Sequence, residues 1–457
     1  MMKQHHLFGT DGIRGQFGKD PLSETIIYSM SLALGKWLKQ THKKAKKLTV
    51  IIGKDTRASC DKIEQCLARG FQKSGIEVLS AGVIPTPGLA YLANAMDVHL
   101  GVMISASHNP WTDNGIKFFK HNGYKLSERQ ERAVEKIAFP IIADQAKKKQ
   151  DKCPKIKIKK ISAKPYIDHL KTCCEGLDLK GMKIAIDCAN GASSAYAEDL
   201  FSDFGAKVFT INNKPNGKNI NLDCGSTHPE ALAELIKKKK ADIGFSFDGD
   251  ADRVIFADDK SKILDGDYIT TMITRYFIAE NKLPSQVVVG TSMSNFGLEK
   301  LMDSMDVKLI RADVGDKYVL EQIIKNKANF GGEQSGHMIF LDYATTGDGM
   351  LTALQILMAL FKTKKKIGSL CRGLKKYPQL IHNVKVTKRI AFEKMPEVNS
   401  LIKKAHKQLE GKGRLVMRYS GTEFLARVMV EGDNEKDINK IAQDIGGAIA
   451  EQIGVKP

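Results

Sequence analysis

An internal repeat of strand-like and helix-like segments constrains the fold of this chain more than any other feature. Each copy opens with a short β-branched run, continues through two helical stretches separated by a second run, and ends with a third run. The opening runs of the three copies are Leu48–Ile52, Lys183–Asp187 and Gln286–Gly290. Strands that alternate with helices form parallel sheets through right-handed crossovers. The repeat therefore predicts three similar βαβαβ domains of the α/β class, with mixed or parallel sheets.

The chain from about Tyr377 onward breaks this alternation. A strand-like run at Asn383–Thr387 precedes an amphipathic helix at Pro396–Leu409, and two further strands flank a short polar loop. Strands that are joined by a short loop and backed by helices indicate a small α+β domain. We therefore expect four domains, with the ranges 1–155, 156–256, 257–375 and 376–457.

Composition excludes several protein classes. The 457 residues are 42% hydrophobic and 27% charged, as in ordinary globular proteins. The N-terminal segment lacks the apolar core of a secretory signal, and the apolar helical run Met350–Phe361 is too short to cross a bilayer. The eight cysteines are scattered without Cys-x-x-Cys spacing, which favours reduced thiols. We expect a cytoplasmic protein without a membrane partner.

The formal net charge of +19 has two interpretations. Basic runs such as Lys155–Lys160 and Lys237–Lys240 could form a nucleic-acid-binding face. They are dispersed, rich in lysine and without interleaved aromatic residues, so we favour solvated helix faces and loops and expect no nucleic-acid partner. A positive field also attracts a small anionic substrate.

Polar loops follow the third run of each repeat, at Ser105–Pro110, Asp248–Arg253 and Gly331–His337. In parallel α/β sheets, ligands bind outside the carboxyl ends of the strands, where these loops are expected to lie. The sequence therefore predicts one active site that is assembled from three domains.

The second loop carries Asp248, Asp250 and Asp252 at alternate positions. In an extended loop this spacing turns the carboxylates to one side, where they can surround a hard cation. The loop also resembles the start of an EF-hand, but Arg253 and Asp259 stand where that motif requires Gly and Glu. We therefore expect a Mg²⁺ site.

Ser107 in the first loop also has two interpretations. Before a helix it would be an N-cap, a role that Ser105 could fill equally well. Beside His108 and a bound cation, its hydroxyl would be a phosphoryl acceptor, which is the interpretation that we favour. The absence of Gly-x-Ser-x-Gly argues against an acyl-transfer hydrolase.

The third loop has the glycine spacing of a P-loop, but His337 replaces the required lysine, which argues against an NTPase. Glu333 and Ser335 offer an acceptor and a mixed donor and acceptor for a polyol. A simple polar turn is the competing interpretation.

The C-terminal polar loop combines a guanidinium, hydroxyls and flexible backbone N–H groups, which suits an anion. An ordinary hairpin loop is the competing interpretation. Its candidate ligands are Arg418, Ser420, Gly421 and Thr422, and further candidates elsewhere are Arg14 and Lys117.

Taken together, five motifs resemble those of the α-D-phosphohexomutases, in the order in which that family carries them. They span essentially the whole chain and stand at Phe8–Gly15, Ile104–Pro110, Asp248–Arg253, Gly332–His337 and Arg418–Glu423. Phe424 departs from the pattern, because proline usually follows the last motif. The resemblance implies four domains around a central cleft.

The resemblance also implies roles for individual residues. Ser107 would be a phosphoserine whose phosphoryl oxygen binds one Mg²⁺ together with Asp248, Asp250 and Asp252. The substrate would contact Glu333 and Ser335 through sugar hydroxyls, and Arg418, Ser420, Gly421 and Thr422 through its phosphate. The candidates for proton transfer, charge stabilisation or contacts near the transferred group are His108, Lys117, His337, Arg14 and Arg253.

Val314–Val319 and Thr345–Gly349 resemble the branch of the family that acts on hexosamine phosphates. The implied reaction interconverts glucosamine 6-phosphate and glucosamine 1-phosphate, on the route to UDP-N-acetylglucosamine. Glucosamine 1,6-bisphosphate would be both intermediate and activator, and a homodimer is a candidate assembly. One alternative keeps the chemistry but uses mannose or glucose phosphates, and another is a non-catalytic, basic nucleic-acid binder.

Overall fold

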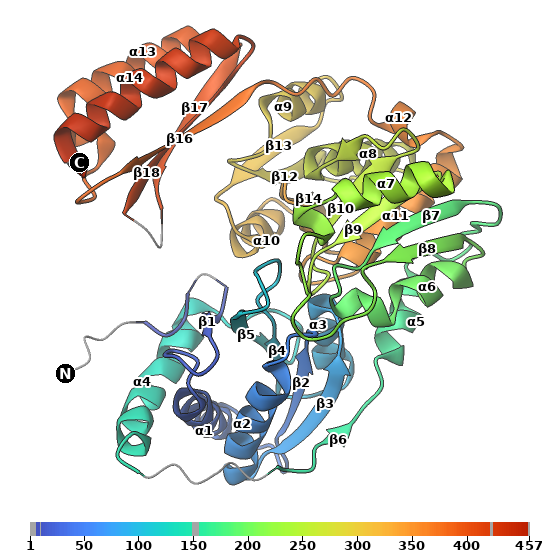
Figure 1. Ribbon diagram of the computed structural model, residues 1–457, viewed down its shortest axis with the longest axis vertical. Coiled ribbons are helices and arrows are strands. Elements are labelled where there is room, and N and C mark those ends of the chain that lie inside the picture. The colour runs from blue at the N-terminus through green and yellow to red at the C-terminus, as the bar shows by residue number, and fades with distance from the viewer. Residues whose placement is uncertain (1–5, 10, 149–154, 421–423, 456–457) are drawn as a thin grey trace.

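The computed structural model describes residues 6–9, 11–148, 155–420 and 424–455. These residues form four β-sheets, one in each of four successive units. In Figure 1 the units follow one another in an arc, from the blue N-terminal unit through green and yellow to the red C-terminal unit.

The first unit is a six-stranded sheet with helices packed against it. Its strand order is β1-β5-β4-β2-β3-β6, in which β5 is antiparallel to both of its neighbours and β2, β3, β4 and β6 run parallel. The elements are β1 (Ile13–Gln16), α1 (Glu24–Thr41), β2 (Thr49–Lys54), α2 (Cys60–Lys73), β3 (Glu77–Val83), α3 (Thr86–Ala95), β4 (Leu100–Ile104), β5 (Asp113–Lys120), α4 (Glu128–Gln145) and β6 (Lys159–Lys160).

The second and third units repeat the central part of this sheet. Their strand orders are β11-β10-β9-β7-β8 and β13-β12-β14-β15. The second unit contains α5 (Lys164–Thr172), β7 (Lys183–Asp187), α6 (Ala197–Asp203), β8 (Lys207–Ile211), α7 (Glu230–Lys239), β9 (Ile243–Phe247), β10 (Val254–Asp258) and β11 (Ile263–Leu264). The third contains α8 (Gly266–Ala279), β12 (Val287–Thr291), α9 (Phe296–Asp303), β13 (Lys308–Ala312), α10 (Asp316–Lys325), β14 (Phe330–Gly332), β15 (Met338–Phe340), α11 (Gly349–Thr363) and α12 (Ile367–Leu370).

In each repeat the third predicted strand is followed directly by a strand that the sequence pattern does not predict. After the third strand the chain turns back, and β5, β10 and β15 pair antiparallel with β4, β9 and β14. The interpretation of Ser107 as a helix N-cap is therefore wrong, because a hairpin follows it. The added strand also makes each sheet mixed rather than purely parallel.

The apolar faces explain how the units pack. One continuous core joins the second and third units, and it includes Phe247 and Phe256 from one sheet, and Phe330 and Leu354 from the other unit. Helix α11 is buried almost all round, which accounts for its uninterrupted apolar sequence. Its N-cap is Asp348, whose carboxylate accepts a hydrogen bond from Leu351 N at 2.9 Å. The apolar run Met350–Phe361 therefore belongs to a helix in the interior of the protein.

The C-terminal unit has a core of its own. Its antiparallel sheet has the order β16-β18-β17 and carries two helices, which confirms the α+β prediction. The elements are β16 (Gln379–Lys385), α13 (Pro396–Leu409), β17 (Gly413–Tyr419), β18 (Leu425–Gly432) and α14 (Glu435–Ile453).

The sheets bear on where the domains divide. Strand β6, at 159–160, pairs with β3 of the first sheet, and β11, at 263–264, completes the second. We propose that the first two boundaries lie a few residues later than the 155/156 and 256/257 divisions that the sequence suggests. Across the described part of the chain, no helix combines the length and apolar character needed to span a bilayer.

Candidate active site

The three polar loops join the third and fourth strands of their repeats, so each is the tip of a β-hairpin. The tips lie at the carboxyl ends of β4, β9 and β14, where α/β sheets bind ligands. Contacts between the tips are direct, because Val254 N donates to Gly336 O at 3.1 Å and Ser107 Oγ donates to Asp248 Oδ2 at 2.6 Å. The predicted meeting of loops from three units is therefore present.

The aspartate loop is a tight turn rather than the extended segment that the spacing suggested. Ala251 N donates to Asp248 O at 3.0 Å, and Ala251 has a positive φ of 54°. The curl nevertheless gathers Asp248, Asp250 and Asp252, whose ligand oxygens all lie within 4.8 Å of one another. All three side chains are buried.

This cluster fits a hard cation. Among the described residues, Asp250 Oδ1 and Asp252 Oδ1 are buried without a hydrogen-bond partner, which is costly for a carboxylate oxygen. Burial, together with the Asp252 and Asp250 carboxylates, raises the pKa of Asp248 well above its usual range. A divalent cation would supply the missing partner and offset the repulsion, and oxygen donors are those that Mg²⁺ prefers.

Ser107 is buried against this cluster, with 3% of its surface exposed. Its backbone occupies the left-handed region at φ 51°, an uncommon conformation for a residue other than glycine. Its N–H donates to Ser105 Oγ at 2.9 Å, and its Oγ points to Asp248. The hydroxyl therefore lies beside the carboxylates that could hold a metal ion.

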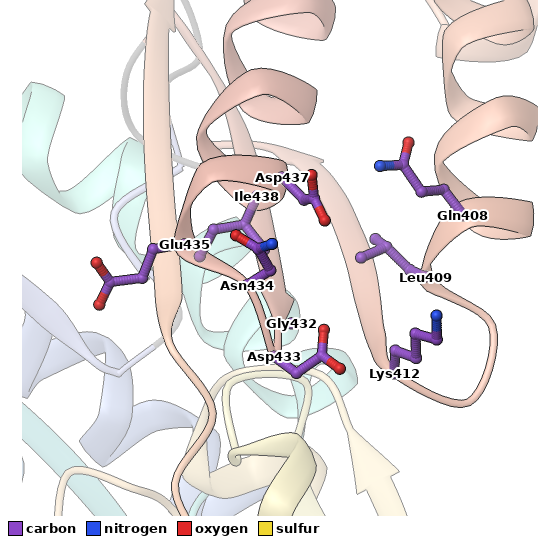
Figure 2. A pocket seen from close by; sticks show the side chains of 9 residues that line it. All are labelled: Gln408, Leu409, Lys412, Gly432, Asp433, Asn434, Glu435, Asp437 and Ile438. Carbon is purple, nitrogen blue, oxygen red and sulfur yellow. The ribbon is translucent and has the colours of Figure 1, made fainter.

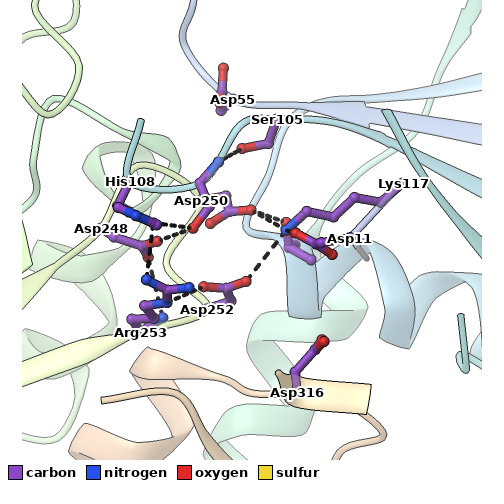
Figure 3. Close-up of polar contacts among 12 residues, drawn as sticks. Asp11, Asp55, Ser105, His108, Lys117, Asp248, Asp250, Asp252, Arg253 and Asp316 are labelled. Carbon is purple, nitrogen blue, oxygen red and sulfur yellow. Dashed lines mark hydrogen bonds and ion pairs between the residues drawn. The ribbon is translucent and has the colours of Figure 1, made fainter. Parts of the chain in front are cut away.

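Lys117 crosses to the cluster from β5, as Figure 3 shows. Its Nζ lies 3.1 Å from Asp250 Oδ2, 3.5 Å from Asp252 Oδ2 and 3.3 Å from Asp11 Oδ2. Burial alone would lower the pKa of Lys117, but the Asp11 and Asp250 carboxylates raise it above its ordinary value. The side chain is thus a fixed positive charge at the site.

Arg253 and His108 flank the aspartate cluster on its other side (Figure 3). Arg253 Nη1 lies 2.9 Å from His108 Nδ1, and Arg253 N donates to Asp248 Oδ1 at 3.2 Å. Burial and the Arg253 charge lower the pKa of His108 to about 4. His108 is therefore a neutral imidazole at neutral pH, with Nδ1 as acceptor.

Sequence reasoning missed a charged chain that links the first and third units. Arg14 pairs with Asp11 and lies 3.5 Å from Ser105 O through Nη1. Lys125 binds both Asp11 and Asp316, the latter at the start of α10. Asp11 lies inside the Phe8–Gly15 motif, so that motif was the available signal, whereas nothing in the sequence pairs Lys125 with Asp316.

The third loop lies close to Arg253, and its Glu333 is bonded both within the loop and to the residue before α10. Glu333 Oε2 accepts from Ser335 Oγ at 3.0 Å, and Glu333 Oε1 accepts from Gly315 N at 3.0 Å. His337 is buried, with Nε2 4.0 Å from Asp252 Oδ2, and neither ring nitrogen has a hydrogen-bond partner among the described residues. Glu333 and Ser335 thus form a polar pair beside the charged cluster.

Arg418 and Ser420 are the C-terminal candidates that the structure describes. Arg418 lies at the end of β17, and no hydrogen bond or ion pair within the described ranges joins it to the aspartates. Ser420 is buried and donates its N–H to Leu425 O at 2.8 Å. Gly421 and Thr422 lie outside the described residues. Phe424 is exposed, and the Arg389 guanidinium lies 5.5 Å from its ring centroid.

A cavity of about 540 Å³ lies elsewhere in the C-terminal unit, between α13 and the start of α14. Figure 2 shows Lys412 and the acidic side chains of Asp433, Glu435 and Asp437 around it. Among the described residues, no buried polar side-chain atom that lacks a hydrogen-bond partner lines this cavity, whereas the aspartate cluster contains such atoms in Asp250 and Asp252. The cluster at Asp248–Asp252 is the stronger candidate site.

Comparison with known families agrees with this architecture. Phosphoglucomutase/phosphomannomutase models match in series: alpha/beta/alpha domain I at residues 5–144, domain II at 164–262, domain III at 265–377 and the C-terminal domain at 382–447. The chain belongs to this family. The predicted resemblance and the prediction of three α/β domains with a fourth, C-terminal domain are thereby confirmed.

Individual members of the family match over the full length. A phosphoglucosamine mutase of Caldicellulosiruptor saccharolyticus is 42% identical and covers 98% of this chain and 99% of its own. A phosphoglucomutase/phosphomannomutase family protein of Burkholderia thailandensis has a similar structure, with a TM-score of 0.78, 21% identity and complete coverage of both chains. An Aspergillus fumigatus N-acetylphosphoglucosamine mutase, solved with GlcNAc-6P and magnesium, gives a TM-score of 0.65 at 17% identity and covers 97% and 95%.

Proposed function

We propose that this protein interconverts glucosamine 6-phosphate and glucosamine 1-phosphate, and that Ser107 carries the phosphoryl group that is exchanged. The observation that carries the proposal is the hydrogen bond from Ser107 Oγ to Asp248 Oδ2, at 2.6 Å, beside carboxylate oxygens that lack partners. The full-length relative named phosphoglucosamine mutase supports the choice of sugar.

Asp248, Asp250 and Asp252, with a phosphoryl oxygen on Ser107, would hold Mg²⁺, the ion named with the Aspergillus fumigatus structure. When bound, the ion neutralises charge on the transferred phosphoryl group. A phosphoserine carries about −1.5 to −2 charge, which three bare carboxylates would repel. Lys117 and Arg253 supply further fixed positive charge at the same place.

In the forward half-reaction, the O1 hydroxyl of glucosamine 6-phosphate attacks the phosphorus while the bond to Ser107 Oγ breaks. The O1 hydroxyl gives up its proton as it attacks, and Ser107 Oγ takes one up as it leaves, so the step consumes no net proton. His108 lies 3.5 Å from Ser107 Oγ through Nδ1, but that nitrogen accepts from Arg253 Nη1, so its proposed role is to orient Arg253 and stabilise charge beside the transferred group. The product is glucosamine 1,6-bisphosphate. After reorientation its 6-phosphoryl group returns to Ser107, and glucosamine 1-phosphate leaves.

Two orientations of the sugar must use one phosphate clamp, and Arg418, Ser420, Gly421 and Thr422 are the proposed clamp. Arg14 would assist near the transferred group. Glu333 and Ser335 would hold ring hydroxyls, with His337 beside Asp252 as a further contact. On substrate binding, Glu333 and Ser335 would replace the 3.0 Å hydrogen bond between them by hydrogen bonds to the sugar.

Peptide mapping and a coupled mutase assay test the proposal. We expect one phosphoryl group on Ser107, activity that requires Mg²⁺ and a sugar bisphosphate, and no activity in Ser107→Ala. Turnover should be faster with glucosamine 1-phosphate than with mannose 1-phosphate or glucose 1-phosphate. An active Ser107→Ala variant, or phosphate only on Ser105, would refute the assignment. A homodimer stays a prediction, and light scattering on the purified protein tests it.

A further inference from the structure

The backbone carbonyl of Ser107 is bound by two side chains that no sequence motif brings together. Arg57 Nη2 donates to Ser107 O at 2.9 Å, and Asn221 Nδ2 donates to the same oxygen at 2.8 Å. Arg57 follows β2 in the first unit, whereas Asn221 follows β8 in the second. The carbonyl of the reacting serine is thus a point at which two units meet.

Arg57 is rigidly placed. Its side chain and that of Asp55 are both 0% exposed, and Asp55 Oδ2 accepts from Arg57 Nε at 2.8 Å. The guanidinium also binds Asn109 O at 2.9 Å and Pro110 O. A buried guanidinium whose Nε, Nη1 and Nη2 are all hydrogen-bonded has little freedom, so it holds the Ser107 loop in one conformation from within its own unit.

Asn221 holds the same loop from the second unit. Its amide Nδ2 donates to Ser107 O and to Asn109 O, at 2.8 and 3.0 Å, so both N–H groups are used. Its own N–H donates to Ala189 O at 2.9 Å, which anchors it beside the end of β7. Asn221 is buried, so no water competes freely for these bonds.

The aspartate loop packs against this same contact. A Cβ on Gly249 would lie 2.7 Å from Ser107 O and 2.8 Å from Asn221 Nδ2, closer than real Cβ atoms approach. Gly249 separates Asp248 from Asp250, so the Ser107 carbonyl is seated directly on the turn that carries the proposed metal ligands. Holding this carbonyl fixes where Ser107 Oγ stands relative to Asp248.

From this geometry we infer that Asn221 is a positioning residue for phosphoryl transfer. It keeps Ser107 in its left-handed conformation and sets the register between the serine loop of the first unit and the aspartate turn of the second. A non-glycine residue at φ 51° persists only where its surroundings impose that conformation. Asn221 acts through Ser107 and contacts no reacting atom. The inference rests on the proposed function.

The test replaces Asn221 by Asp, which has the same shape but cannot donate these bonds. Because small misplacements of reacting groups are costly, we expect kcat to fall by about tenfold to a hundredfold while KM for the sugar phosphate changes less than about threefold. Asn221→Gln, which keeps the donor, should recover part of kcat. The matched control is Asn219→Asp in the same loop, whose partly exposed side chain bonds only within the loop, to Lys214 O and Asn216 N.

Thermal unfolding of each variant separates positioning from folding, since a kcat loss at an unchanged midpoint is a positioning effect. The inference is wrong if Asn221→Asp keeps wild-type kcat, or if kcat falls only in proportion to lost folded protein. It is also wrong if KM rises as much as kcat falls. A wild-type protein without mutase activity would refute the proposed function instead, which keeps the two failures distinct.

Discussion

We propose the same task, the binding of phosphate, for the serine and aspartate loops and for Arg418 in the C-terminal unit, but the described residues at the two places are held differently. The first two are buried and joined by hydrogen bonds between units, such as Thr86 Oγ1 to Asp250 Oδ2 at 2.6 Å. Arg418 is on a unit with its own core, which meets the third unit through polar contacts such as Arg414 to Ser292 O at 2.8 Å.

The difference teaches how a mutase can combine a fixed reaction centre with a substrate that must turn over. Chemistry requires the reacting groups to be held, and packing across units holds them. We propose that a clamp that grips either end of the sugar benefits instead from a unit whose described residues form a core of their own. The predictions below test this division, from the largest expected effect to the smallest.

Asp250→Asn should have the largest effect, a loss of kcat by about a hundredfold to a thousandfold, because it removes charge from the preorganised centre. Mg²⁺ should also raise the unfolding midpoint of the wild type more than that of the variant. Coupled mutase kinetics and calorimetry with and without Mg²⁺ measure these effects. Asp242→Asn, on an exposed carboxylate that caps Lys183 N, is the matched control. Equal kcat in Asp250→Asn and the wild type would contradict the view that the aspartate cluster is the fixed reaction centre.

Arg414→Ala should destabilise the attachment of the C-terminal unit. Arg414 Nε donates to Glu431 Oε2 at 2.7 Å, and Glu431 is fully buried, so truncation leaves an unpaired charge. We expect the free energy of unfolding to fall by about 3 kcal/mol. Urea unfolding measures it, with Lys300→Ala as control because its bond to Gly411 O is exposed. No difference between the two variants would show that the polar contact does not hold the unit.

Arg418→Ala should raise KM for the sugar phosphate by about tenfold to a hundredfold, the range expected when a charge-assisted hydrogen bond is lost. The KM of Arg418→Lys should lie between those of the wild type and Arg418→Ala, because lysine keeps the charge but lacks the planar guanidinium. Stability should not change, since the Arg418 side chain makes no hydrogen bond or ion pair with the described residues. Steady-state kinetics measure both constants. An unchanged KM with a reduced kcat would show that Arg418 acts in the reaction centre and not in substrate binding.

Asp348 should give the smallest effect, on stability against pH. Burial raises its pKa to about 6, although its hydrogen bonds from Leu351 N and Tyr166 Oη oppose the shift. Because the folded pKa exceeds the unfolded one, the contribution is present below about pH 4 and is lost as pH rises through 6, by at most about 3 kcal/mol. Chemical unfolding from pH 4 to 7 should show a flatter profile in Asp348→Asn. If stability depends on pH equally in the wild type and in Asp348→Asn, another group is responsible for the titration.

Much of the fold follows from the sequence because its signals are local. The three opening runs became β2, β7 and β12, and the predicted helix Pro396–Leu409 has the same bounds as α13. The antiparallel strands β5, β10 and β15 were missed. They follow short polar turns and lack a helix to mark them, and Asn114–Lys117 in β5 looks like a loop because of its Asn-Gly pair.

The site divides in the same way. Ser107, Asp248, Asp250 and Asp252 could be named because hydroxyl and carboxylates have recognisable chemistry in short motifs. Arg57, Asn221, Lys125 and Asp316 could not be assigned, because the contacts that give them a role join residues far apart along the chain.

The order of residues by itself determined the repeated α/β units, the distinct C-terminal unit and the chemical groups available for phosphoryl transfer. Tertiary structure alone decided which of those groups meet, that the aspartate loop is a turn, and that Ser107 adopts a left-handed conformation. The physical reason is the separation along the chain over which each kind of interaction acts. Periodicity and turn chemistry act over a few residues, whereas hydrogen bonds between residues more than a hundred positions apart exist only after the units have packed.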